Sequence, residues 1–144
     1  MTVASILLQK GSRVISVSPD ATVEQITKVL ATERIGAVLV RDLDGVLIGI
    51  LSERDIVRGL ADRGAETLRL PAHALMSRSV ATCTPDDSVA HVMEIMTERR
   101  FRHVPVVEHG RLVGMISIGD VVKERLGEQA EEVEGLRAFV AGAA

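Results

Sequence analysis

The sequence predicts an α/β protein built from two copies of one small unit, because two observations coincide. Segments of the first half recur in the second half in the same order, and each copy alternates apolar runs with stretches of helical periodicity. Two such copies should form two equivalent clefts, which suits a binding module better than an enzyme with one site. The repeated segments are 19–23 with 85–89, 35–40 with 101–106, and 49–55 with 114–120.

The first copy contains signals for each of its elements. Thr22 with Gln25 is a capping-box pattern, so a helix is expected to begin there. The strands are apolar at nearly every position, so both of their faces should be covered. The expected elements are helices at 3–8, after Thr22 and at 52–62, and strands at 14–17, 37–41 and 46–51.

The second copy repeats this order with a hairpin turn one residue shorter, at His109-Gly110. A deletion at a loop tip leaves the strand register intact, which supports a true repeat. Strands are expected at 80–82, 104–107 and 112–116, with helices beginning near 86–88 and at 117. The predicted division is 1–62 for the first unit with its N-terminal helix, 63–75 for a linker, 76–124 for the second unit and 125–144 for a C-terminal helical tail.

Composition excludes several classes of function. The chain has 144 residues, net charge −3 and no Trp or Tyr, which argues against nucleic-acid binding through a cationic or aromatic surface. No apolar run approaches the length that spans a bilayer, and the short run 5–8 before Lys10 is no signal peptide, so no membrane partner and a cytoplasmic location are expected. The single cysteine, Cys83, is expected to be buried as a small apolar residue.

The tail carries an apolar stripe whose members alternate in steps of four and three. This spacing is typical of a coiled-coil seam, although Gly127 and Gly135 weaken the helix. The helix either covers its own domain or packs on another subunit. The stripe consists of Val122, Leu126, Gln129, Val133, Leu136 and Val140.

The pattern Gly-apolar-apolar-Ser-x-x-Asp occurs twice, each time where a strand gives way to a helix. In one interpretation, Ser52 and Ser117 only cap helices, with Asp55 and Asp120 in the first turn. In the other, the helix start accepts an anion, the preceding glycine lets a ligand ring approach the backbone, and the carboxylate accepts hydrogen bonds from a ribose diol. The two interpretations are compatible, and the duplication favours binding.

Other chemistry has little support in the sequence. The four histidines lack metal-ligand spacing, so no metal site is expected. No nucleophile, base and orienting group come together in a recognisable motif, so no enzyme activity is expected.

These motifs, together with the segments around them, resemble a tandem pair of CBS domains, known as a Bateman module. The similarity covers residues 3–124 and is greatest to small stand-alone CBS-pair proteins of bacteria and plant organelles. It implies two β-α-β-β-α units related by a pseudo-twofold axis and packed through their sheets, with a C-terminal helix added here. It also implies ligands of the adenosine class, namely AMP, ADP, ATP, NAD or S-adenosylmethionine, and a homodimer that regulates an unknown protein.

The resemblance also implies two clefts, each lined by both units. Asp55 and Asp120 would hold the ribose diols, and Arg102, His103 and Arg54 would face phosphate. Because these three cations have no counterpart in the other copy, we expect either unequal affinities or different ligands in the two clefts. The Asp120 cleft would add Ser117, Met115, Arg102 and His103, with Arg13 and Ile15 from the first unit; the Asp55 cleft would add Ser52, Ile50, Gly36 and Ala37, with Ser79 and Ala81 from the second.

Two functions follow from this sequence. The first is a non-catalytic adenine-nucleotide sensor, in which binding shifts the population of conformations that a partner recognises. The alternative is an interaction or dimerisation module in which the Ser and Asp residues only cap helices and the tail stripe is the working surface.

Overall fold

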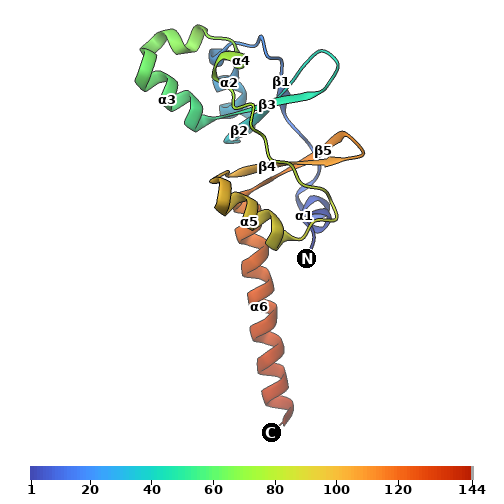
Figure 1. The fold of residues 1–144 in the computed structure, drawn as a ribbon. Helices are drawn as coiled ribbons and strands as arrows, with labels where there is room; N and C mark the ends of the chain where they lie inside the picture. The colour runs from blue at the N-terminus through green and yellow to red at the C-terminus, as the bar shows by residue number, and fades with distance from the viewer. Residues whose placement is uncertain (144) are drawn as a thin grey trace. The chain divides into compact units, whose positions relative to one another are not determined.

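The computed structural model describes residues 1–143, and its mixed α/β class agrees with the prediction (Figure 1). The chain divides into two compact units, each with its own cluster of buried apolar residues. We call residues 13–81 the contiguous unit, and residues 1–12 with 82–144 the split unit. The elements are α1 (Val3–Lys10), β1 (Ser16–Val17), α2 (Val23–Glu33), β2 (Ala37–Arg41), β3 (Leu47–Ser52), α3 (Glu53–Arg63), the 3-10 helix η1 (Gly64–Arg69), α4 (Ala72–Leu75), α5 (Val89–Arg99), β4 (His103–Glu108), β5 (Arg111–Ser117) and α6 (Ile118–Ala143).

The contiguous unit is built on a three-stranded sheet in the order β1-β2-β3. β1 runs parallel to β2, and β2 pairs antiparallel with β3. The predicted capping box forms at the start of α2, where Gln25 N–H donates to Thr22 Oγ1 at 3.2 Å and Thr22 N–H donates to Gln25 Oε1 at 3.0 Å. The core of this unit joins α2 and the sheet with α3 and the α4 segment, and consists of Val23, Ile26, Leu30, Val38, Val40, Leu51, Ile56, Ala72 and Met76.

The split unit contains the hairpin β4–β5, but the strand expected at 80–82 does not form. Cys83 makes a single parallel bridge there, donating its N–H to Pro105 O and accepting the N–H of Val107. Extending this pairing toward Ala81 would require an N–H from residue 105, and proline has none. In the contiguous unit the matching position is Leu39, whose N–H donates to Ile15 O at 3.2 Å.

The repeat extends to the backbone irregularities. The register of the β2–β3 pair shifts between Val40 and Arg41, and that of the β4–β5 pair shifts at the matching step, Val106 to Val107. α2 and α5 each end at an arginine in the left-handed conformation, Arg34 and Arg100 (the latter with φ 57°). Such matching detail supports the prediction of two copies of one unit.

The N-terminal helix α1 belongs to the split unit, whereas we expected it in the first unit. Val3 N–H donates to Asp87 O and Ala4 N–H donates to Pro85 O, each at 2.9 Å. Val3 and Ile6 are buried in the core around α5 and the β4–β5 hairpin. The helix is placed by these long-range contacts, which its own sequence does not reveal.

The expected linker, 63–75, is instead folded onto the contiguous unit as η1 and α4. Ala72 N–H donates to Ala21 O at 2.8 Å, and His73 N–H donates to Pro19 O at 3.0 Å. Thr67 is fully buried, and its hydroxyl donates to Gly59 O. These hydrogen bonds match those that Val3 and Ala4 of α1 make to Asp87 and Pro85. α1 precedes the first repeat but packs in the unit of the second, and α4 precedes the second repeat but packs in the unit of the first.

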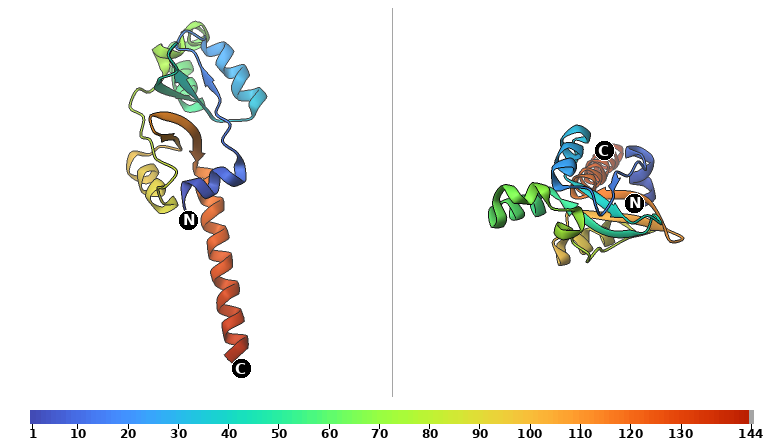
Figure 2. Two further views of the ribbon diagram at one scale, coloured as in Figure 1. Left: turned by 90° about the vertical axis from the view of Figure 1, so that its right-hand side faces the viewer. Right: turned by 90° about the horizontal axis from the view of Figure 1, so that it is seen from above.

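The C-terminal tail is not a separate element, because α6 runs without a break from Ile118 to Ala143. Its first turns pack on α5 and β5 of the split unit, with Val121 and Glu124 buried. From Gln129 to Gly142 every described side chain is exposed, and the helix extends beyond the rest of its unit in Figure 1 and in the left view of Figure 2. The tail therefore does not cover its own unit. Among residues 1–143, no helix is both long and apolar enough to cross a membrane.

Candidate functional site

The first candidate site is the start of α3, where Ser52 ends β3 and caps the helix. Asp55 Oδ2 accepts hydrogen bonds from Ser52 N–H at 2.9 Å and from Ser52 Oγ at 3.0 Å. In return, Asp55 N–H is directed at Ser52 Oγ, at 3.4 Å. The capping interpretation of this pair is therefore correct. Within residues 1–143 these bonds leave Asp55 Oδ1 without a hydrogen bond, on a partly exposed side chain.

The second candidate site, at the start of α6, repeats this arrangement and adds a cation. Ser117 N–H donates to Asp120 Oδ2 at 2.8 Å, and Asp120 N–H donates to Ser117 Oγ at 3.2 Å. Lys10, the last residue of α1, donates from Nζ to the same Oδ2 at 2.7 Å and to Met115 O at 2.9 Å. The ammonium thus contacts two of the predicted nucleotide-binding residues, Met115 and Asp120.

The electrostatics of the second site depend on these donors. Partial burial raises the pKa of the Asp120 carboxyl, but hydrogen bonds from Lys10 and Ser117, with the nearby positive charge, outweigh burial and hold this pKa below its ordinary value. The group is therefore ionised at neutral pH and can accept hydrogen bonds. Lys10 was missed as a site residue because its partner lies 110 residues away in the sequence.

The helix starts offer an anion fewer open amides than expected. The first amide of α3, that of Glu53, donates to Gly36 O at 2.9 Å, and the first amide of α6, that of Ile118, donates to Arg102 O at 2.8 Å. With the amides of Asp55 and Asp120 directed at the capping serines, part of the usual anion site at a helix N-terminus is already occupied.

We expected the two glycines of the motif to leave room for a ligand ring. The space beside each of them is instead filled by other residues of the same unit. A Cβ at Gly49 would lie 2.5 Å from Met76 Sδ and 3.0 Å from Ser77 O. A Cβ at Gly114 would lie 2.7 Å from Leu7 Cδ2. The glycines are therefore required for packing within each unit, against the segment that precedes the other repeat.

The contiguous unit holds all ten predicted site residues between 13 and 81, including Ser79 and Ala81, which we had expected in the second unit. The chain is tied to β3 just before them, since Ile50 and Ser77 exchange backbone hydrogen bonds at 3.0 and 2.9 Å. Arg13 forms an ion pair with Glu33 at 3.2 Å, while its side chain remains 75% exposed. Ile50 pairs with Leu39 and Ala37 pairs with Ser52, so the backbone of β2 and β3 positions the Ser–Asp pair.

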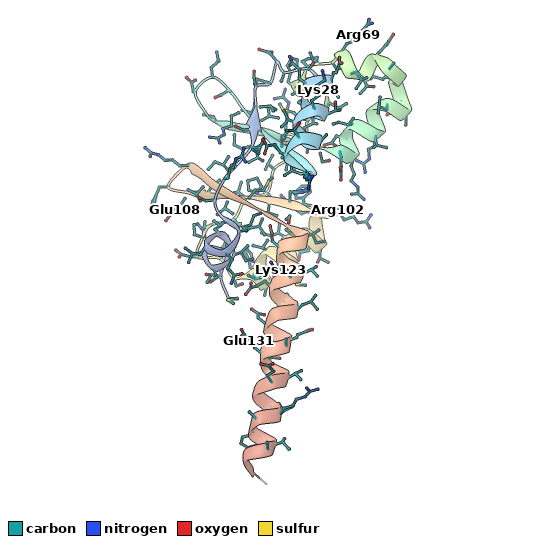
Figure 3. The ribbon with its side chains drawn as sticks, turned by 180° about the vertical axis from the view of Figure 1, so that it is seen from behind. Lys28, Arg69, Arg102, Glu108, Lys123 and Glu131 are labelled. Carbon is teal, nitrogen blue, oxygen red and sulfur yellow. The ribbon has the colours of Figure 1, made fainter. Side chains whose placement is uncertain are left out.

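The split unit brings together the other five predicted residues. His103 and Ser117 are register partners at the ends of β4 and β5, and Met115 pairs with Pro105. Arg102 is exposed and lies beside the first turn of α6 (Figure 3). The matching turn of the contiguous unit has Gly36 in place of Arg102, while its α3 carries an exposed Arg54 where α6 has Gly119. The cationic side chains thus differ between the two sites.

These features define a protein with two small α/β units, each carrying a Ser–Asp pair at the start of a helix that follows a β-hairpin. The chain belongs to the CBS domain family, whose model matches residues 6–62 and 72–127 and so identifies two CBS domains in tandem. The mitochondrial CBS domain-containing protein CBSX3 of Arabidopsis thaliana is 30% identical over 149 residues, covering 98% of this chain and 72% of that protein.

Solved structures of CBS proteins match the fold over most of the chain. The CBS-domain protein ATU1752 of Agrobacterium tumefaciens is 46% identical with a TM-score of 0.84, covering 86% of this chain and 92% of that one. PAE2072 of Pyrobaculum aerophilum, solved in complex with AMP, is 31% identical with a TM-score of 0.75, covering 83% and 89%. The CBS pair of protein MJ0100, in complex with 5′-methylthioadenosine and S-adenosyl-L-methionine, is 26% identical with a TM-score of 0.79, covering 89% and 98%.

Proposed function

We propose that this CBS pair is a non-catalytic regulatory module that binds adenosine compounds and signals through a change in its packing or in its partner contacts. One observation carries the proposal. Both copies hold an aspartate at a helix start, and Asp55 keeps one carboxylate oxygen free of hydrogen bonds within residues 1–143. Each carboxylate is fixed by its serine, so it is oriented before a ribose diol arrives. Neighbours in the family were solved with AMP, 5′-methylthioadenosine or S-adenosyl-L-methionine.

The ribose-binding role falls to Asp55 and Asp120 in this proposal, and Arg54, Arg102 and His103 select phosphate. Gly36, Ile50 and Met115 contribute backbone groups, as the resemblance implies. The sites hold different cations, so we infer unequal affinities for AMP, ADP, ATP and NAD. A homodimer and a cytoplasmic location remain predictions.

Isothermal titration calorimetry of the whole chain with AMP, ATP, NAD and S-adenosylmethionine tests the proposal. Asp55→Asn and Asp120→Asn keep a side-chain oxygen for capping but remove the charge that receives the ribose hydroxyls, so each should weaken binding at one site. Asp86→Asn, at an exposed aspartate outside both sites, is the matched control. The proposal is wrong if ligand-free wild-type protein binds none of the four compounds, or if both site variants bind like the control.

A protein–protein interaction module without a nucleotide role is the second candidate. It is favoured by the exposed apolar residues of α6 and by the fact that capping alone accounts for the Ser–Asp hydrogen bonds. In that case the two Asp→Asn variants would keep partner binding, and no adenosine compound would raise the melting temperature of the wild-type chain.

A further inference from the structure

An apolar stripe on α6 runs from the second turn of the helix to its last turns and is exposed along that length. We define the stripe as Val122, Leu126, Gln129, Val133, Leu136 and Val140, whose apolar members are between 47% and 65% exposed. The helix stands apart from the rest of its unit beside the labelled residue Glu131 (Figure 3). The part of α6 from Gln129 to Gly142 is exposed throughout and follows Gly127 and includes Gly135, so it is a poor stand-alone helix, because most helical stability in proteins comes from packing an apolar face.

The stripe points away from the unit on which α6 is anchored. Successive residues of a helix are rotated by about 100° around its axis. On this basis the middle of the stripe lies more than a quarter-turn around the helix axis from Val121 and Glu124, which are buried against that unit. Both helix-weakening glycines fall outside the stripe. The stripe is therefore open to a partner along its whole length without disturbing the anchored turns.

We propose that the stripe is a parallel, in-register coiled-coil interface with a second copy of this chain. Leu126, Val133 and Val140 take the a positions of the heptad, and Val122, Gln129 and Leu136 take the d positions. In the heptad that starts at Val133, a β-branched a residue is followed by leucine at d, a combination that favours two parallel strands. Gln129 also takes a d position and meets its own copy across the seam. Like polar residues buried at other seam positions, it fixes the register at a cost in stability.

Charge on the flanks of the stripe selects the parallel orientation. Glu132 lies at a g position and Arg137 at the following e position, so a parallel pair places Glu132 beside Arg137 of the other copy, twice by symmetry. An antiparallel pair that aligns the whole stripe places Glu132 beside Glu132, and Lys123 beside Arg137. Like charges at these positions oppose association.

Cysteine crosslinking of the full chain tests this interface separately from any other dimer contact. Under mild oxidation Val133→Cys should form a disulfide-linked dimer, because residue 133 of each copy lies in the same layer only in the parallel register. Ala138→Cys, on the outer face of the same helix, is the matched control and should remain monomeric on non-reducing gels. Equal crosslinking of the two variants, or none of Val133→Cys, would overturn the proposal.

Sedimentation equilibrium supplies the second measurement and tests orientation. Leu136→Lys should raise the dimer dissociation constant by about a hundredfold or more, because each symmetric dimer loses two buried leucines, whereas Ala138→Lys should not. Arg137→Glu should weaken the dimer and Glu132→Arg combined with Arg137→Glu should restore it. A dimer that Arg137→Glu strengthens is antiparallel and contradicts the proposal, as does a dissociation constant that Leu136→Lys leaves unchanged. The outcome does not depend on nucleotide binding.

Discussion

The Lys10–Asp120 ion pair should make the second site the weaker one for uncharged adenosine ligands. Lys10 Nζ lies 2.7 Å from the carboxylate oxygen Oδ2, so a ribose diol that approaches Asp120 must compete with the ammonium. In Lys10→Met the carboxylate is open while the aliphatic part of the side chain is kept. We therefore expect the substitution to tighten ligand binding at this site.

The size of the effect follows from the exposure of the pair. The two side chains are 36% and 21% exposed, so solvent screens their attraction and the pair contributes about 0.2–1 kcal/mol. Because about 1.4 kcal/mol corresponds to a tenfold change in affinity, Lys10→Met should tighten binding by roughly 1.4- to 5-fold. The bond from Lys10 to Met115 O favours the upper part of this range.

Calorimetry with 5′-methylthioadenosine measures this change without a phosphate that would interact with the lysine. All proteins that are compared carry Asp55→Asn, so that only the Asp120 site binds the ligand. Lys28→Met removes the same charge from an exposed position in the contiguous unit and serves as the control. If Lys10→Met binds this ligand no more tightly than the control variant, the ammonium does not compete for Asp120 and the reasoning is refuted.

Three further predictions concern stability and reactivity. Gly49→Ala should lower the free energy of unfolding by about 1–3 kcal/mol in urea titrations, because the added Cβ would meet Met76 and the rigid backbone at Ser77 O. Gly114→Ala should lower it less, because the added Cβ would meet only the side chain of Leu7. Cys83 is 3% exposed and burial, followed by a nearby carboxylate, raises its pKa to about 12, so iodoacetamide at pH 8 should alkylate it only after unfolding. The pKa of Asp120 is lower in the native state than in the unfolded state, so its ionised form stabilises the native state at pH values above the ordinary carboxyl pKa. This stability is lost as the pH falls through the pKa that Asp120 has in the native state. Removing Lys10 should therefore make the free energy of unfolding fall less steeply at acid pH.

Features set by neighbouring residues could be predicted from the sequence. The capping box at Thr22, the starts of α3 and α6 and the shorter second hairpin all follow from residues within a few positions of each other. Turn and cap chemistry acts locally, so a repeated motif repeats its structure. The Ser–Asp pairs of both candidate sites were found in this way.

Features set by distant residues could not be predicted. The missing strand at 80–82 depends on Pro105, which lacks the N–H that a longer pairing would use. The ammonium at Asp120 comes from Lys10, and the space beside Gly114 is filled by Leu7. The contacts of Lys10 and Leu7 both depend on the packing of α1 in the split unit. Nothing in the sequence of residues 3–8 indicates which repeat this helix contacts.

The exchange of leading helices has a consequence for biosynthesis. Residues 1–12 leave the ribosome before the contiguous unit, whereas the residues that bury them, between 83 and 121, leave after it. The contiguous unit can fold as soon as residue 81 has emerged, while Val3 and Ile6 stay without their partners until residue 121 has emerged. Nascent chains arrested between these points should therefore expose the apolar side chains of α1, which is the kind of surface that chaperones bind.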